Sequence, residues 1–363
     1  MSLRLLGIVT SGSHLSGFAE KFLFSELSRQ HQIVGVFYPR LSGLNWCLNV
    51  VKSFHPKRDR WDQLFDKNAW AFRRKSQICE RKIQSLKNNI SLVFGFGCFC
   101  APTTGCSTPY VLYIDSTMKM AEREYPPWAP FRSYKERLDW LKLEQQVYSK
   151  AAKIFTFSEY TRRALMRDYG IDGTKIVTVY WGANIHEMPC YDKDYSSKTI
   201  LFVGRDFERK GGAFLVKAFK EVRKVVRDAK LVILGSMPKI AIDGVVAYGF
   251  VDEEQKLRLA RKASLYVMPS FYEPAGHVFA EAMAYKIPCI GSTKDAMPEI
   301  IEEGKNGFLV PLNDVKTLAG RIVYLLRDDN LIKSMGENAQ RKAKEIFTWG
   351  KVAERIAYNL KQI

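Results

Sequence analysis

Two glutamates, Glu273 and Glu281, lie eight positions apart where a predicted strand gives way to a predicted helix. Pro274 and Gly276 mark a turn after an apolar run, and a helical pattern begins at His277. Glu273 therefore precedes the positive N-terminal end of the helix, and Glu281 falls about one turn inside it. Two carboxylates beside such an end can bind the hydroxyls of a polyol while the helix end binds phosphate. The alternative is that Glu273 is a helix-terminal charge partner and Glu281 a surface residue.

The predicted helix has one apolar side, on which we expect Val278, Ala282 and Tyr285 to face the core. This orientation leaves Glu281 on the exposed side. The backbone N–H groups of residues 276–278 have no partner within the helix, and we expect them to point toward a ligand.

A second loop carries two basic residues, Arg205 and Lys210, between a predicted strand over Thr199–Val203 and a predicted helix. Gly204 lets the backbone turn where a side chain would obstruct a ligand, and the glycines at 211–212 open the helix. Arg205 offers a fork suited to phosphate and Lys210 a point charge. The Gly-Lys-Ser/Thr order of a Walker loop is missing. Basic loop residues that are simply solvated are the alternative.

Strands and helices alternate in both halves of the chain, which predicts two doubly wound α/β domains. The polar stretch over 183–198 separates the halves. Ligands of such sheets bind outside the carboxyl ends of the strands, and both loops fall at such ends. The predicted strands are Leu3–Val9, Ile33–Tyr38, Ser91–Phe96, Tyr110–Ile114, Ile154–Phe157, Ile176–Tyr180, Thr199–Val203, Leu231–Leu234, Val245–Tyr248, Ser264–Met268 and Pro288–Gly291.

The net charge of +18 predicts a polyanionic partner: nucleic acid, an anionic membrane surface or a phosphorylated small molecule. Basic residues concentrate over Lys52–Lys87, interleaved with Trp61, Trp70 and Phe72. This pattern is typical of a segment lying in the plane of a membrane interface, and equally of a solvated basic helix face. Nucleic acid is not expected, because the motifs of its common binding modules are missing.

The cysteines and the apolar runs indicate the cellular compartment of the protein. Cys98, Cys100 and Cys106 cluster without a matching histidine set, so we expect buried thiols in a reducing cytosol rather than a metal site. The first residues do not resemble a signal peptide, and no apolar run approaches the roughly 20 residues of a membrane span. We expect a cytoplasmic protein, either free or bound peripherally to the inner face of the membrane.

The second half resembles the donor domain of retaining glycosyltransferases with the GT-B fold, in particular glycosyltransferase family 4, over residues 199–326. Its signature is a Glu, seven residues and a second Glu that opens the sequence Glu-Ala-Met-Ala, as at Glu273 and Glu281. The resemblance extends to Phe202–Arg205, Lys210-Gly211, Gly276, Pro288–Gly291, Pro298–Ile301 and Asn306–Val310. It is weaker over the first half.

The resemblance implies roles for these residues. Arg205 and Lys210 bind the donor diphosphate and stabilise the leaving nucleotide. Glu281 binds the ribose hydroxyls, and Glu273 contacts the transferred sugar. The amides that hold sugar and phosphate are those of Gly276, His277, Val278 and Phe279.

Further positions follow from the same resemblance. Gly12 resembles a glycine that lets the diphosphate approach the first domain, and Phe250 and Val251 lie in the segment that reads the nucleobase. Many members place a histidine facing the donor sugar at the end of a first-domain strand; here Asp115 is the candidate for that place. Members often carry a Gly-Gly pair where this chain has Ser292–Asp295.

The implied architecture is two Rossmann-like domains facing across a cleft. Residues 1–184 form the acceptor domain, 185–198 the linker and 199–345 the donor domain. Residues 346–363 form a C-terminal helix that crosses back to the first domain, and the pattern predicts one helix over Glu345–Ile363.

The implied activity is a hexosyltransferase-like transfer with retention of configuration. It uses a UDP- or GDP-sugar as co-substrate, with no metal and no other cofactor. The acceptor is lipid-linked, phosphorylated or a polysaccharide. The alternatives are a basic nucleic-acid-binding protein, or another sugar-nucleotide enzyme of this fold such as an epimerase. A phosphorylase of this fold would need a pyridoxal-phosphate lysine in a much longer chain.

Overall fold

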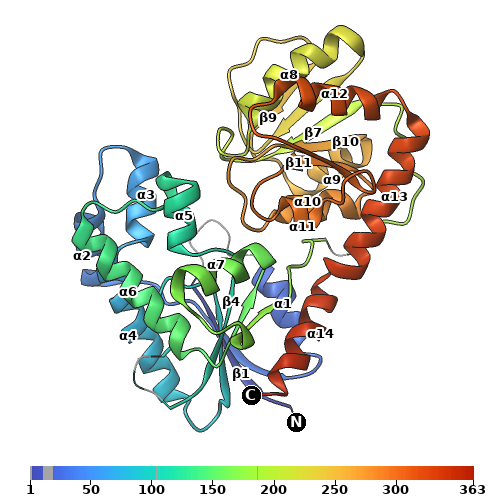
Figure 1. Ribbon diagram of the computed structural model, residues 1–363. Helices are drawn as coiled ribbons and strands as arrows, with labels where there is room; N and C mark the ends of the chain where they lie inside the picture. The colour runs from blue at the N-terminus through green and yellow to red at the C-terminus, as the bar shows by residue number, and fades with distance from the viewer. Residues whose placement is uncertain (1, 11–18, 104, 106, 186) are drawn as a thin grey trace. The chain divides into compact units, whose positions relative to one another are not determined.

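The computed structural model describes residues 2–10, 19–103, 105, 107–185 and 187–363. The chain divides into two compact units (Figure 1). The first comprises Met1–Tyr180 and Trp349–Ile363, and the second comprises Trp181–Thr348. Each unit is built around its own parallel sheet.

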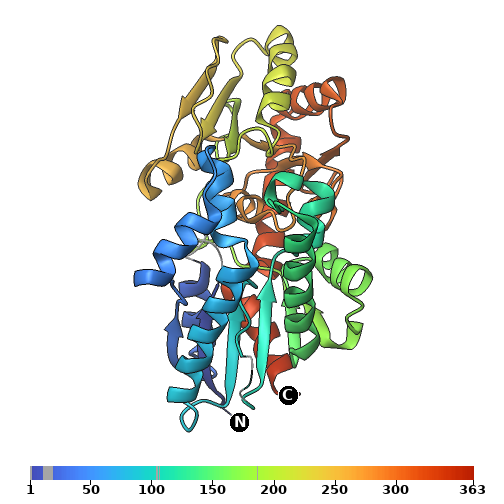
Figure 2. The same cartoon turned by 90° about the vertical axis from the view of Figure 1, so that its left-hand side faces the viewer.

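The sheet of the first unit has the strand order β2-β1-β3-β4-β5-β6. Figures 1 and 2 show α1 and α14 on one face of this sheet and α4 and α6 on the other. The strands are β1 Arg4–Val9, β2 Gln32–Phe37, β3 Leu92–Phe96, β4 Tyr110–Ile114, β5 Lys153–Thr156 and β6 Ile176–Thr178. The α-helices are α1 Ala19–Leu27, α2 Gly43–Ser53, α3 Arg58–Asp66, α4 Ala69–Ser85, α5 Met118–Glu124, α6 Tyr134–Lys150, α7 Glu159–Tyr169 and α14 Trp349–Leu360.

The sheet of the second unit has the strand order β12-β11-β10-β7-β8-β9. Figure 1 shows α8 and α12 above it and α10 and α11 below. The strands are β7 Thr199–Val203, β8 Lys230–Leu234, β9 Val245–Tyr248, β10 Leu265–Met268, β11 Cys289–Ser292 and β12 Gly307–Val310. The helices are α8 Gly212–Val225, α9 Glu253–Lys262, α10 His277–Ala284, α11 Met297–Ile300, α12 Val315–Leu326 and α13 Asp329–Ile346. The strand order reverses between β7 and β10, which is where such sheets bind ligands.

The predicted doubly wound α/β fold is confirmed in both units, and the predicted strands agree with the observed ones to within about two residues at each end. Strand β12 was not predicted. The predicted single helix over 345–363 is wrong, because the chain leaves the helical path at Phe347 and Thr348, between α13 and α14. Most of the predicted linker packs on the second unit. There, the Lys193 ammonium donates to the Ala260 carbonyl oxygen at 2.9 Å.

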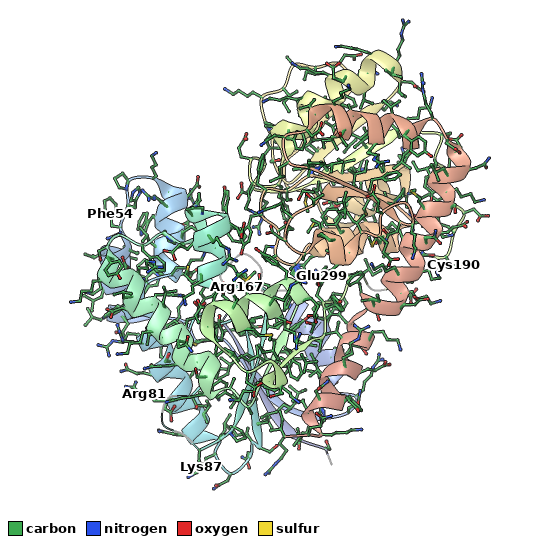
Figure 3. All side chains as sticks on the ribbon, in the orientation of Figure 1. Phe54, Arg81, Lys87, Arg167, Cys190 and Glu299 are labelled. Atoms are coloured by element: carbon green, nitrogen blue, oxygen red, sulfur yellow. The ribbon has the colours of Figure 1, made fainter. Side chains whose placement is uncertain are left out.

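The basic stretch over Lys52–Lys87 does not form one interfacial segment. It folds into the end of α2, all of α3 and α4, and the turns between them. Figure 3 shows Phe54 at one end of the first unit and Arg81 and Lys87 toward the other. Phe72 is buried in the core, and Trp61 is half-buried. Within the described ranges, no helix combines the length and apolarity needed to cross a membrane.

The predicted buried thiols are confirmed for Cys98 and Cys100. The Cys100 sulfur lies 3.5 Å from the Cys79 sulfur, and both side chains are buried. Cys106 lies outside the described residues.

A buried carboxyl, Glu144 of α6, joins three elements of the first unit. It accepts hydrogen bonds from the Met118 N–H at 3.1 Å, the Tyr148 hydroxyl at 2.9 Å and the Tyr169 hydroxyl. Burial raises the pKa of Glu144 to about 7, although these hydrogen bonds and Lys119 favour the charged form. The carboxyl therefore changes charge near neutral pH inside a packed core.

The replacement Glu144→Gln should change how the stability of the first unit depends on pH. The folded pKa is about 7 and the ordinary value is 4.5, so between these values the folded state holds more protons than the unfolded chain. The wild type therefore loses stability as pH rises from about 4.5 to 7, relative to Glu144→Gln. Urea unfolding midpoints of both proteins across this range measure the difference. Parallel pH profiles would contradict the assignment.

Candidate functional site

The loops after β7 and β10 meet, because these strands are neighbours in one parallel sheet. The Phe271 N–H donates to the Arg209 carbonyl oxygen at 2.8 Å, which ties one loop to the other. Gly211 has φ +77°, and a Cβ there would lie 2.2 Å from the Pro269 carbonyl oxygen. Only glycine fits this approach, so the two loops form one structural piece.

The loops bring together a small cluster of charges. A Glu273 carboxylate oxygen lies 3.4 Å from an Arg209 nitrogen and 3.7 Å from the Lys210 ammonium. The Arg209 guanidinium also pairs with Asp206 at 3.1 Å and donates to the Tyr272 carbonyl oxygen. The Glu273 and Lys210 side chains are 12% and 13% exposed, and Arg209 is 6% exposed. These charges therefore interact in a partly water-excluded place, where electrostatic interactions are strong.

The electrostatics keep Glu273 ionised. Burial alone would raise its pKa, but Lys210, Arg209, His277 and the Gly276 N–H outweigh burial, and the pKa is lowered. Burial lowers the pKa of Lys210, while Glu273 opposes this shift. At neutral pH the cluster thus holds a carboxylate beside a lysine whose positive charge is less favoured than in water.

Glu273 also shapes the start of α10. Its carboxylate accepts the Gly276 N–H at 3.2 Å, and its own N–H donates to Asp295 at 2.8 Å. Gly276 has φ +71°, which suits a glycine at this turn. The structure therefore shows the helix-terminal role that was one of the two interpretations of Glu273. The Gly276 N–H, expected to point toward a ligand, is bonded within the loop.

The predicted core side of α10 is confirmed for Ala282 and Tyr285, which are buried. It is wrong for Val278, which is only half-buried, whereas Phe279 beside it is buried. The His277 ring packs edge-on to Trp181 at 5.4 Å between centroids. Burial lowers the pKa of His277 to about 4, with Glu273 opposing and Lys210 adding to the shift. The imidazole is therefore neutral at pH 7.

The predicted exposure of Glu281 is wrong. Its side chain is only 12% exposed, because the Lys256 ammonium from α9 lies 3.1 Å from its carboxylate. Burial lowers the pKa of Lys256, but Glu281 and Glu253 outweigh this, and the pKa is raised. Arg209 and Lys256 are the two charged partners that sequence analysis missed. In the sequence, Lys256 follows Glu253 by three positions, a spacing that pairs charges within a helix.

The other predicted donor residues lie at the same edge of the sheet. Arg205 is exposed on the loop after β7. Phe250, which is 92% exposed, and the half-buried Val251 follow β9, and the Gly235 N–H donates to the Gly249 carbonyl oxygen at 2.9 Å. Strand β8 lies between β9 and β7.

Asp115 belongs to the first unit, where it follows β4. Its carboxylate accepts the Ser116 hydroxyl at 3.1 Å. Burial lowers the pKa of Lys67 to about 8, and Asp115 is the first of the acids that oppose this shift. Asp115 therefore lies close enough to the half-buried Lys67 to interact with its charge. Gly12 lies outside the described residues.

A metal site in a protein needs several histidine, cysteine, aspartate or glutamate side chains close together. Over the part of the chain that the structure describes, no three such side chains are grouped so as to hold a metal ion.

A family comparison identifies the second unit. Residues 188–342 match the model described as Glycosyl transferases group 1. This half of the chain is therefore a glycosyl transferases group 1 domain, and the predicted likeness to glycosyltransferase family 4 is confirmed.

Curated relatives match the same region. The chain is 28% identical to spore coat protein SA of Bacillus subtilis over 239 residues, covering 56% of this chain and 63% of the relative. It is 31% identical to the phosphatidyl-myo-inositol mannosyltransferase of Mycobacterium leprae over 212 residues, covering 55% and 56%. The matches thus span between about half and two thirds of the curated relatives' lengths.

A solved structure extends the likeness to nearly the whole chain. The Anabaena protein HepE, crystallised with UDP-glucose, superposes with a TM-score of 0.69 at 16% identity, covering 99% of this chain and 100% of HepE. The fold is therefore the GT-B fold, with two Rossmann-like domains, as predicted.

The replacement Gly211→Ala should disrupt the junction of the two loops. Its Cβ would overlap the Pro269 carbonyl oxygen, and the left-handed φ adds strain, so we expect a loss of about 3 kcal/mol or more. The matched control is Gly304→Ala in the same unit. Gly304 has φ +76° with nothing within 4 Å, so only about 1 kcal/mol should be lost. Denaturant unfolding measures both, and equal losses would contradict the close approach.

Proposed function

We propose that this chain is a glycosyltransferase that moves a sugar from a nucleotide sugar to an acceptor, and that its second unit binds the donor. The observation that carries the proposal is the cluster of Glu273, Lys210 and Arg209 at the switch point of a glycosyl transferases group 1 domain. The UDP-glucose bound by HepE supports a nucleotide sugar as the class of donor.

The cations of the cluster suit a diphosphate. Lys210 is fixed beside Glu273, and Arg205 lies exposed on the same loop. A diphosphate beside Lys210 would favour the charged state of this lysine, which burial disfavours. Negative charge that develops on the leaving nucleotide would be stabilised by groups already in position, so we propose that no metal ion is needed.

The carboxylates suit the hydroxyls of the donor. Glu273 is ionised at the start of α10, and we assign it to the transferred sugar. Glu281, held by Lys256 at 3.1 Å, is assigned to the ribose hydroxyls. The peptide N–H groups of residues 276–279 and the segment at Phe250 and Val251 are assigned to the phosphates, sugar and nucleobase.

The proposed reaction retains the configuration of the anomeric carbon. The bond from this carbon to the diphosphate oxygen breaks, and the electron pair leaves with the nucleotide. The acceptor oxygen forms its bond to the same face of the carbon, and its proton passes to the leaving phosphate. Asp115 of the first unit is assigned to a sugar or acceptor hydroxyl. It cannot supply the positive charge of an imidazolium.

The acceptor is proposed to be lipid-linked, phosphorylated or a polysaccharide, because the net charge of +18 favours an anionic partner. The mannosyltransferase of M. leprae, named for phosphatidyl-myo-inositol, supports the first of these classes. The family match does not favour the nucleic-acid-binding alternative.

The replacement Lys210→Ala should lower donor turnover by about 100-fold, the usual effect of removing one fixed group that stabilises developing charge. The control Lys305→Ala removes a lysine of the same unit that is 73% exposed, and should leave turnover unchanged. Nucleotide release from UDP- and GDP-sugars measures the rate, and calorimetry with UDP and GDP measures binding. Full activity of Lys210→Ala with an unchanged melting temperature would refute the site.

The product should have the same anomeric configuration as the donor sugar, because the proposed reaction takes place on one face. Proton NMR of a product made from an isotope-labelled donor reports the configuration. The rate should be unaffected by a chelator. An inverted product, or a rate restored only by added Mg²⁺ or Mn²⁺, would refute the proposed mechanism without refuting glycosyl transfer.

A further inference from the structure

Helix α2 of the first unit has its polar side inward and its apolar side outward. The residues it buries are Asn49 and Ser53. Leu44, Leu48 and Val51 are spaced to share one helix face, and they are 75%, 39% and 73% exposed. A helix that packs on a protein core shows the opposite pattern. This apolar face is therefore not packed on the core of its own unit.

Hydrogen bonds fix the polar side of α2 in place. The Asn49 amide donates to the Phe65 carbonyl oxygen at 2.9 Å and accepts from the Asn68 amide at 3.0 Å. The Trp61 indole donates to the Ser53 hydroxyl at 3.1 Å. Rotating the helix to bury its leucines would break these bonds and leave the buried polar groups of Asn49 and Ser53 without partners. The outward direction of the apolar face is thus set by its own neighbours.

The apolar surface continues beyond the helix. Phe54, which follows α2, is 58% exposed and lies at the outer edge of the first unit (Figure 3). The Arg132 guanidinium donates to the carbonyl oxygens of Lys52, at 2.9 Å, and Phe54. This contact places the start of α6 beside the end of α2. There Tyr134 is 72% exposed.

Positive charge surrounds this surface. Asp59 is the only acidic residue between residues 40 and 60. At the start of α6, Glu136 accepts the Arg132 N–H at 3.0 Å. The exposed basic residues around α2, its end and the start of α6 are Arg40, Lys52, Lys57, Arg58, Arg60, Arg132 and Lys135. An exposed apolar stripe flanked by cations matches an anionic lipid surface, which has an apolar interior beneath a layer of phosphates.

We propose that α2 and Phe54 form a docking surface for an anionic lipid bilayer, with the helix lying in the plane of the interface. Leu44, Leu48 and Val51 enter the boundary between headgroups and acyl chains. Lys57 and Arg58 contact lipid phosphates. This site goes beyond the proposed glycosyl transfer and shares no residue with the proposed donor and acceptor sites.

Co-sedimentation of the full chain with vesicles tests the proposal. The wild type should sediment with phosphatidylcholine vesicles that contain phosphatidylglycerol, and far less with phosphatidylcholine alone. The triple variant Leu44→Ser, Leu48→Ser, Val51→Ser should lose at least about tenfold in affinity for the anionic vesicles. The matched control Val225→Ser, Met166→Ser, Tyr358→Ser removes apolar residues that are 46%, 41% and 66% exposed, and should bind as the wild type does.

A second variant tests the charge. The triple variant Lys57→Gln, Arg58→Gln, Arg60→Gln should weaken binding to anionic vesicles and reduce the dependence of binding on salt.

Three results would overturn the proposal: no sedimentation of the wild type with anionic vesicles, equal sedimentation of the wild type and the serine variant, or a wild-type dimer that the serine variant converts to monomer. The last result would assign the face to a second copy of the chain. Circular dichroism of each variant checks its folding.

Discussion

The close approach of the loops after β7 and β10 is the constraint on which the donor half depends. Gly211 has no side chain, and this alone lets the first loop lie against the Pro269 carbonyl. The approach places Arg209 and Lys210 against Glu273, and the balance among these groups keeps a nearly buried carboxylate ionised. Moving one loop away from the other would separate the charges and leave each one poorly solvated.

Two members of this cluster, Glu273 and Arg209, have a structural task. Glu273 holds the first turn of α10 through the Gly276 N–H, and Arg209 holds the loop through the Tyr272 carbonyl oxygen. Under the proposed function, a donor bound beside Glu273 would act on the backbone of both loops. Its binding would then be coupled to local folding, because the same groups would serve both.

Much of the fold was predictable, and the site was predictable in outline. Strands such as β4 and β7 are apolar runs bounded by turns. The spacing of Glu273 and Glu281 can be recognised in the sequence without a structure. Partners contributed by distant segments were not predictable. In the sequence, Arg209 and Lys256 look like surface residues. Only the packing of α9 near α10 brings Lys256 to the carboxylate of Glu281. The half-buried position of Val278 on α10 was missed because a short helix gives too few apolar positions to fix its phase.

Helix α14 completes the first unit although it comes last in the chain. Its side chains Trp349, Val352 and Ile356 are buried, and the helix packs against α1. The first unit is thus assembled from two separate stretches of sequence, and the second is inserted between them. A fragment ending at Tyr180 would lack part of its own core. A chain cut at that point would still be held together, because α14 anchors the remainder to the first fragment by folding with it.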